Sequence, residues 1–491
     1  MNKNQFALSL IITCCVSLSA VAQNVFTLTD IIERSKAQSP ASKQAETRKE
    51  NRYWQYRYYK TNFNPQLRLS GNLPNYLKKV NQIEQNNGSF DYSLVQRSNT
   101  DVSLGLMQPI QWTGGTISAN SGLNFYNDYA YNETDTTSYK QWSGTVVNIA
   151  LQQPLFAFNP LRWQKKIEPL LYEESKREYV EQMEFVSREA VNRFFNVLQA
   201  QSNLQIAQFN LANNDTIYKI EQGRYNIGTT SQDKLLQVEL QLLRSRQAVA
   251  QSRLELETAR LQLRSYIGLR NGEEFQLSLP EGIPVFDVTE DDALSHAKNN
   301  RAAYIAFERR RMEADQEVAE ARGQRFRVDL VAAYGLSNDG YSAGDIYKDP
   351  EDLQQFNVGF NIPVLDWGRN KSNMKRALAN KKLNDYIIAQ DQVDFEQTII
   401  TQVRQFEMLR LQIEITKKSD EVASERYNVA QNRYLIGKID VTNLNIALTE
   451  KDDAKQGYIQ ALKLFWTAYY DLRRLTLFDF SSKRLLYNPE L

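Results

Sequence analysis

Two long helical stretches dominate this chain of 491 residues and limit the folds that it can adopt. Their apolar residues recur at three- and four-residue steps, from about Leu161 to Gln222 and from about Arg369 to Gln431. At 1.5 Å per residue, each helix would be about 90 Å long, well beyond the width of a globular core. Each stretch therefore predicts one long helix that offers an apolar seam to partner helices.

The chain is also an internal duplication. The motif Arg-Tyr-x-Ile-Gly occurs at residues 224–228 and again at 433–437, a shift of 209 positions that carries Pro154 onto Pro363. A second shift, of 261 positions, relates the segments that precede this region, so the first copy contains 52 additional residues. The repeat predicts two copies of one structural unit.

Each copy has one shorter helical stretch before its strands and another after its long helix. In the first copy they span about 41–63 and 230–267, and the second copy begins with the equivalent stretch 302–323. In both copies the two short helices together approach the length of the long one, so they can line it end to end. A soluble spectrin-like coiled coil would explain the helices equally well.

Strictly alternating segments predict strands in both copies. In residues 101–107, 116–125 and 356–363, apolar side chains take one face and polar side chains the other. A membrane barrel with a wet lumen requires this pattern, although a soluble sandwich shows it too. The 52 additional residues hold one extra hairpin around the turn QWTGG, and we expect longer loops at about 75–99 and 127–140. This hairpin either gives six barrel strands per protomer instead of four, which the alternation favours, or forms an extracellular extension.

The first 22 residues have the pattern of a secretory signal peptide, with a cleavage site after Ala22. Both cysteines, Cys14 and Cys15, lie inside it, so disulfides and cysteine-ligated metals are not expected in the mature chain. The remaining 58 basic residues balance 58 acidic ones, so no net field attracts nucleic acid. For the aromatic segment 51–63, a membrane-interface belt is favoured over stacking on nucleic acid.

The sequence offers little for catalysis. His296 is the one histidine, and its polar helical context predicts a surface residue. The chain shows no phosphate-cradling glycine loop, nucleophile elbow or HExxH motif. We therefore expect no enzyme, no catalytic residue, no cofactor and no metal site.

The duplication, the strand-to-helix junctions QPLFAFNPLRW and IPVLDWGRNKS, and the paired Arg-Tyr-x-Ile-Gly motifs resemble the TolC family of outer-membrane channel proteins. The resemblance implies an α+β membrane protein, a trimer that shares one transmembrane β-barrel, continued by a long α-helical coiled-coil barrel across the periplasm. It implies a signal peptide at 1–22, a first repeat at 23–267 with strands in about 65–153, and a connecting equatorial segment at 268–288. A second repeat at 289–475, with strands in about 327–363, and a C-terminal tail at 476–491 would follow.

By the same resemblance, the two motifs are tips of helical hairpins at the inner end of the tunnel. The residues expected to contact a periplasmic adaptor are Ile227, Gly228, Thr229, Ile436, Gly437 and Lys438. Those expected at the gate are Arg224, Tyr225, Asp233, Arg433, Tyr434, Asp440 and Asn443. Weak polar links, Arg224 with Asp233 and Arg433 with Asp440, would hold the gate shut; alternatively these charges only solvate the tips, or Ile436 and Ile439 form the constriction. Asn443 and Ile446 stand where the family commonly has acidic residues, which argues against a cation-binding ring.

The expected function is a passive exit duct in the outer membrane of a Gram-negative bacterium. It would release small molecules such as drugs, together with an adaptor protein and an inner-membrane pump that supplies the energy. Type I protein secretion is the alternative within this class, and a soluble periplasmic scaffold the alternative from another. The sequence does not identify the exported substrate.

Overall fold

The structure is a computed structural model that describes residues 24–129, 139–269, 275–280 and 282–488. The predicted signal peptide, with Cys14 and Cys15, lies outside the described residues. The chain divides into two compact units. One comprises Met1–Lys49, Lys176–Ala302 and Val393–Leu491, and the other comprises Glu50–Ser175 and Ala303–Gln392. We call them the helical unit and the sheet unit.

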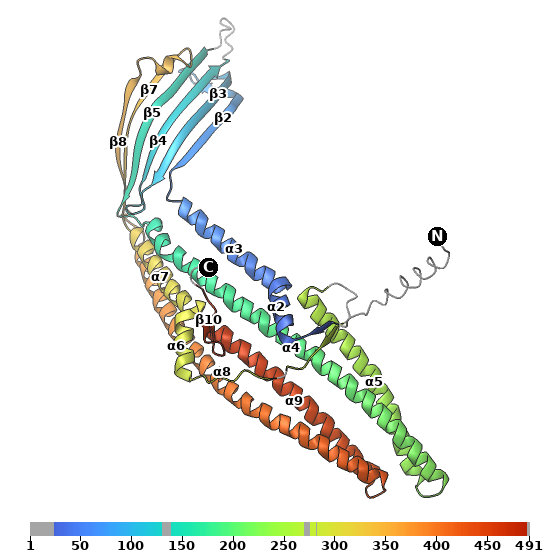
Figure 1. Ribbon diagram of the computed structural model, residues 1–491. Coiled ribbons are helices and arrows are strands. Elements are labelled where there is room, and N and C mark those ends of the chain that lie inside the picture. Colours follow the sequence, from blue (N-terminus) through green and yellow to red (C-terminus); the bar gives the residue numbers. More distant parts are fainter. Residues whose placement is uncertain (1–23, 130–138, 270–274, 281, 489–491) are drawn as a thin grey trace, which may run out of the picture. The chain divides into compact units, whose positions relative to one another are not determined.

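The sheet unit contains a six-stranded antiparallel sheet in the order β2-β3-β4-β5-β7-β8 (Figure 1). Its strands are β2 (Gln66–Glu84), β3 (Phe90–Pro109), β4 (Thr116–Asp128), β5 (Tyr139–Leu155), β7 (Arg327–Gly340) and β8 (Glu351–Asn361). The extra hairpin of the first copy supplies β3 and β4, which lie between β2 and β5. The expectation that this hairpin adds two strands to the sheet is therefore confirmed.

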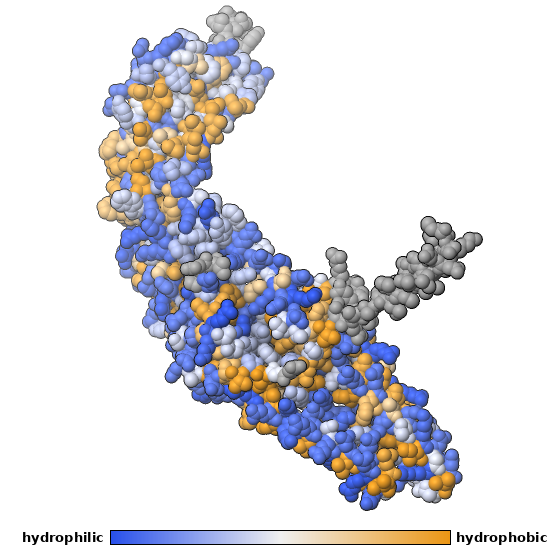
Figure 2. Space-filling model, viewed as in Figure 1, coloured by the Kyte–Doolittle hydropathy of each residue, from blue (hydrophilic) through white to orange (hydrophobic). Residues whose placement is uncertain are grey.

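The register of the sheet separates apolar from polar side chains, as the alternation predicts. Leu106 lies opposite Leu67 and Ala119, and Ala332 lies opposite Phe356, so these residues share one face. On the other face Ser70 pairs with Ser103. The apolar face is open, since Phe356 is 74% exposed, and Figure 2 shows hydrophobic residues gathered over the sheet. An exposed apolar face of this extent requires a partner or a lipid environment.

The prediction of a loop at about 75–99 is wrong. Strand β2 continues to Glu84 and β3 begins at Phe90, with Val80 paired to Leu94. Strand β4 pairs with β3 only as far as Arg97, so beyond that point β2 and β3 form a two-stranded ribbon. Within the described residues only β2 and β3 pair there, and their many polar residues give this segment the composition of a loop. The other predicted loop, at about 127–140, falls mainly on residues outside the described ranges.

The two predicted long helices are confirmed as α4 (Pro160–Asn226) and α8 (Arg369–Leu435), each of 67 residues. Helix α4 continues through Pro169, which supplies no backbone N–H for the helix ladder. The shorter helices are α3 (Pro40–Thr61), α5 (Gln232–Ile267), α7 (Ala302–Gly323) and α9 (Val441–Thr476). Over the described residues, every helix is too short or too polar to cross a membrane.

Several short elements complete the fold, and among them only the helix that holds His296 is predicted by the sequence. Helix α2 (Leu28–Gln38) starts with a capping box of Thr27 and Asp30, the signal by which it could have been recognised. Strand β1 (Asn24–Phe26) pairs in parallel with β6 (Phe275–Leu277). The remaining elements are α6 (Glu290–Asn300), the 3₁₀ helix η1 (Asp345–Tyr347) of the sheet unit, β9 (Phe478–Asp479) and β10 (Arg484–Leu485).

The prediction that His296 is a surface residue is wrong. His296 on α6 is half-buried, and its ring stacks on that of Phe478 with centroids 3.9 Å apart. Burial lowers the pKa of His296, and the nearby carboxylate of Asp292 opposes this effect. The sequence could not reveal the contact because Phe478 lies about 180 residues further along the chain.

The core of the helical unit is the apolar seam that the long helices predict. Val191, Phe194 and Phe195 of α4 and Phe465 of α9 are fully buried in it. The seam residues Val403 and Phe406 of α8 are buried as well. The helical unit is thus held together by side chains at three- and four-residue steps, whereas the sheet unit leaves its apolar face open.

Candidate functional site: the paired hairpin tips

Two helical hairpins end in tips of the same geometry. Residues 227–231 join α4 to α5, and residues 436–440 join α8 to α9. Gly228 has φ of +75° and Gly437 has φ of +73°, a left-handed conformation that suits glycine at helix ends. In each tip the glycine N–H donates to the tyrosine carbonyl three residues earlier, at 2.9 Å. The repeated motif is therefore a repeated chain reversal.

The two tips differ in how their tyrosines are placed. Tyr225 is 41% exposed, whereas Tyr434 is 2% exposed in a small core with Ile217 and Val238 of the first hairpin. The hydroxyl of Tyr434 donates to Oε1 of Glu221 at 2.8 Å. The second copy has Ala430 at the position equivalent to Glu221, so a duplicate of this bond cannot form at the other tip.

Glu221 is the centre of a small polar network between the hairpins. Its Oε1 atom also accepts from the Arg224 guanidinium at 2.6 Å, and that guanidinium lies 5.4 Å from the Tyr434 ring centroid. Burial raises the pKa of Glu221, but the hydrogen bonds from Tyr434 and Arg224 outweigh burial and the pKa is lowered. Glu221 is therefore held as a carboxylate, and we name the group Glu221–Arg224–Tyr434 the tip latch.

Sequence reasoning missed Glu221. The carboxylates considered there were Asp233 and Asp440, which follow the glycines, whereas Glu221 precedes Gly228 by about two turns. The sequence signal was a difference between the two repeats, since the glutamate of the first repeat aligns with an alanine in the second. Here the charge that occurs in only one repeat makes a contact between the two repeats of the same chain.

The predicted ionic links take a different form within the described chain. Arg224 pairs with Glu221 instead of Asp233, which lies exposed in the first turn of α5. Asp440 caps α9, because its carboxylate accepts the backbone N–H of Asn443 at 2.9 Å. Arg433 is exposed on the surface. Pairing of these charges between neighbouring copies of the chain stays a prediction.

The tips present an exposed apolar end and a polar recess. Ile227 is 75% exposed and Ile436 is 67% exposed, each next to its glycine. Beside them, a pocket of about 480 Å³ lies between the two hairpins. Its lining includes Glu221, Arg224, Thr229, Thr230, Lys234, Tyr434, Gly437, Lys438, Ile439 and Asp440. Three of the predicted adaptor residues, Thr229, Gly437 and Lys438, therefore line the same recess as the latch.

A second polar cluster lies further along the same hairpins. The Lys451 ammonium sits 4.1 Å from the Phe209 ring centroid and 4.6 Å from that of Tyr427. Asn210 donates to the neighbouring Asp452 carboxylate at 2.7 Å. Burial lowers the pKa of Lys451 and raises that of Asp452. Cation–π contacts of this kind stabilise packing between the hairpins.

The arrangement of a duplicated chain with paired tips and a two-faced sheet matches a known family. The outer membrane efflux protein family matches residues 31–269 and 293–476, most of the chain. The chain belongs to this family. Its members are transport channels of the outer membrane, and the resemblance inferred from the sequence is confirmed. A comparison with curated proteins gave no match.

Solved structures agree with the fold of this efflux protein. Its superposition on the CmeC outer membrane channel of Campylobacter jejuni covers 91% of this chain and 85% of CmeC, with 14% identity and a TM-score of 0.65. For VceC of Vibrio cholerae, the coverage is 91% and 95%, with 14% identity and a TM-score of 0.62. For the open state of the MtrE channel of Neisseria gonorrhoeae, it is 91% and 88%, with 16% identity and a TM-score of 0.59.

Replacing Gly437 with alanine should lower the stability of the efflux protein by about 1–2 kcal/mol, because a Cβ atom disfavours the left-handed backbone. The matched control is Gly457→Ala in the interior of α9, where open space surrounds the new methyl group and stability should rise by about 0.5–1 kcal/mol. Thermal unfolding in detergent measures both. Equal shifts in the same direction would contradict the assigned turn geometry.

Proposed function

We propose that this efflux protein is a passive outer-membrane exit duct for small molecules, formed by three copies of the chain. The observation that carries the proposal is the six-stranded sheet with one apolar and one polar face. Strands β2 and β8 are its two edges, and over the described residues no further strand pairs with either. Unpaired edges in lipid leave backbone groups unsatisfied at a cost of several kcal/mol each. Three copies would supply eighteen strands, a number that leaves an aqueous channel.

Exposed apolar seams on the helices support closure of a coiled-coil barrel by the same copies. On α8, Met408, Leu411, Ile415, Val422 and Val429 are spaced as in a heptad and are each more than half exposed. On α5, Leu236, Leu243 and Leu254 are at least half exposed as well. Free helices of this kind bury their seams against neighbours, so contact between α5 and α8 of adjacent copies fits both patterns.

The tips support the role of a regulated entrance. In our proposal, Ile227, Gly228 and Thr229, with Ile436, Gly437 and Lys438, receive the tip of an adaptor protein, and the energy for transport comes from an inner-membrane pump. The latch keeps the two hairpins of each copy together in the resting state. Arg224, Tyr225, Asp233, Arg433, Tyr434, Asp440 and Asn443 would surround this entrance.

The test is to purify the chain from the outer membrane in mild detergent and to measure its mass and its conductance in planar bilayers. A trimer that conducts ions supports the duct. Release with the periplasmic contents as a folded monomer would instead support the soluble scaffold and overturn the proposal. Cargo assays with the intact assembly separate the two transport roles, since export of a protein in place of small molecules would assign type I secretion.

A further inference from the structure

Basic side chains are concentrated at one end of the sheet, although the whole chain is almost neutral. The register places these strand ends at the same end of the sheet, where the strands join the helices of the sheet unit: Gln66, Pro109, Thr116, Leu155, Arg327 and Asn361. The segments that continue from this end are 57–65, 156–168, 320–326 and 363–376. They carry eleven cations against three carboxylates, Glu168, Glu320 and Asp366.

We name these cations the basic collar, and all of them are exposed. They are Arg57, Lys60, Arg162, Lys165, Lys166, Arg322, Arg325, Arg369, Lys371, Lys375 and Arg376. One of the three carboxylates is already engaged, since Asp366 accepts the backbone N–H groups of Gly368 and Asn370 at the start of α8. At the opposite end of the sheet, the connection between β7 and β8 is acidic, because residues 339–352 hold five carboxylates and one lysine.

Exposed aromatic rings accompany the collar. Trp112 in the β3–β4 turn is 85% exposed, Phe156 is 76% exposed and Trp367 is 90% exposed. Phe156 and Trp367 have φ of +61° and +52°, a left-handed conformation that bulky residues rarely adopt. Both follow a strand and precede a long helix, one in each copy of the repeat. Strained backbone at two corresponding junctions, each presenting a ring to solvent, indicates a function for those rings.

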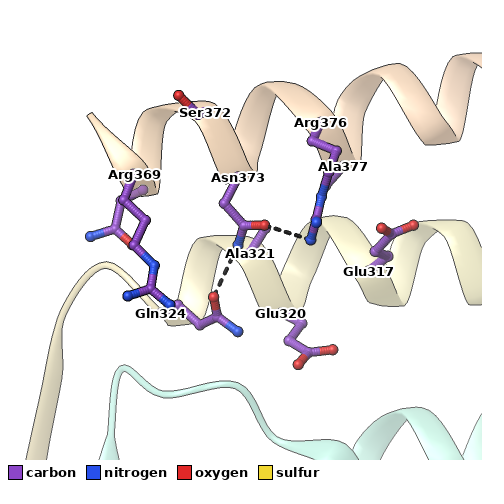
Figure 3. Close-up of a pocket in the computed structure, with 10 residues that line it drawn as sticks. Glu317, Glu320, Ala321, Gln324, Arg369, Ser372, Asn373, Arg376 and Ala377 are labelled. Atoms are coloured by element: carbon purple, nitrogen blue, oxygen red, sulfur yellow. Dashed lines mark hydrogen bonds between the residues drawn. The ribbon is translucent and has the colours of Figure 1, made fainter. Parts of the chain in front are cut away.

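The helices beside the collar form a polar recess. A pocket of about 590 Å³ lies between α7 and the first turns of α8. Figure 3 shows Arg369 and Arg376 reaching from α8 toward α7, with Asn373 between them. The amide of Asn373 donates to Gln324 and accepts from Arg376, each at 2.9 Å. Glu317 and Glu320 line the α7 side.

We infer that the basic collar and its aromatic rings form a docking surface for the anionic phospholipids of the membrane leaflet nearest the helices. Aromatic rings favour the headgroup region of a bilayer, and each Lys or Arg near an anionic leaflet strengthens attachment. Charge complementarity and continuity with the apolar sheet face select lipid as the occupant. The inference rests on the proposed function for the membrane position of the sheet.

The test compares lipids retained by the full-length protein after reconstitution into nanodiscs that contain phosphatidylcholine and phosphatidylglycerol. Mass spectrometry of the bound lipid should show phosphatidylglycerol enriched over the bulk ratio. In the variant R322Q/R325Q/K371Q/K375Q the enrichment should be lower by a factor of at least about five, which is the factor expected for one cation at an anionic surface. The control R244Q/R246Q/R253Q/K417Q removes four exposed cations from the helical unit and should keep the enrichment.

Absence of enrichment in the wild-type protein, or an equal loss in the control, would overturn the inference. Inorganic phosphate, compared with chloride at equal ionic strength, separates a lipid surface from an ion site. If the enrichment is lost in phosphate but kept in chloride, the collar holds a discrete phosphate site, and this result would contradict the lipid surface. Conductance is recorded on the same samples, so failure of the duct and failure of lipid selection are observed independently.

Discussion

Replacing Glu221 with alanine should make the resting channel conduct more. The substitution removes the acceptor of Tyr434, whose bond to Glu221 joins the two hairpins of one copy, and of Arg224 on the same helix as Glu221. Loss of a hydrogen-bonded buried carboxylate costs about 1–3 kcal/mol, and it also leaves the Tyr434 hydroxyl buried without a partner. A change of this size shifts the closed–open equilibrium of each copy by about 5- to 150-fold. Single-channel recording in planar bilayers measures the effect.

The matched control for the latch is Asp215→Ala on the same helix. Asp215 pairs with Lys219 at 2.6 Å, but its side chain is 40% exposed, so its loss should change stability by less than about 1 kcal/mol. Its conductance should equal that of the wild type. If Glu221→Ala assembles as a trimer with unchanged conductance, the latch does not gate the channel, and the apolar residues Ile436 and Ile439 become the constriction.

The latch also predicts how the wild-type channel responds to acid. The pKa of Glu221 is lowered below its ordinary value of 4.5, so the stabilisation is complete above that value. It is lost as the pH falls through the lowered pKa. Conductance of the wild type should therefore rise only in strongly acidic solution, and Glu221→Ala should lack this rise.

A double substitution of Arg433 and Asp440, the residues of one predicted gate link, has a second consequence in the structure. Asp440 caps α9, so its replacement also removes the acceptor of the Asn443 N–H group and costs about 0.5–2 kcal/mol. A leaky channel in that variant would not distinguish a broken ion pair from a frayed helix. Glu221 lies within α4 and avoids this ambiguity.

Periodicity and duplication predict the long elements of this fold because each depends on local spacing. The seam of α4 and the alternation of β8 follow from side-chain positions along one helix or strand. Contacts between segments distant in sequence were not predictable in this way. The stack of His296 on Phe478 and the bond from Tyr434 to Glu221 join residues about 180 and 210 positions apart. The tip turns were recognisable because glycine is needed for their backbone, whereas the latch partner needed the folded geometry.

The aromatic segment 51–63 likewise has a composition that is visible in the sequence and contacts that only the folded structure shows. Tyr59 is buried, and the Tyr56 ring stacks on Tyr172 with centroids 4.8 Å apart, so these rings pack inside the sheet unit. Trp54 and Tyr58 are exposed at 58% and 72%, and for them a membrane-interface belt remains a prediction. Composition identified an aromatic cluster, but only the helical phase of α3 decides which rings face outward.

Replacing Glu184 with alanine should destabilise the helical unit by about 3–5 kcal/mol, since it removes one partner of the buried ion pair between Glu184 and Arg473. The Glu184 side chain is 3% exposed and accepts from Lys36 of α2 at 2.9 Å and from Arg473 of α9 at 2.8 Å. Arg473 also donates to Asp479 of β9 at 2.8 Å, so the cluster fastens both ends of the chain to α4. Thermal unfolding in detergent should show a lower midpoint, and trypsin should cleave after Lys483 sooner.

The control for this cluster is Glu290→Ala, whose partner Arg404 is 71% exposed, and its cost should be within about 1 kcal/mol. The wild-type cluster should also respond to acid. Burial raises the pKa of Asp479, but hydrogen bonds from Ser481 and the charge of Arg473 outweigh burial and lower it to about 2. A lowered pKa gives stabilisation that is present above the ordinary value of 3.8 and is lost as the pH falls toward about 2. If Glu184→Ala and Glu290→Ala unfold at the same temperature, the cluster does not fasten the chain ends, and apolar packing around Phe194 and Phe465 alone holds them.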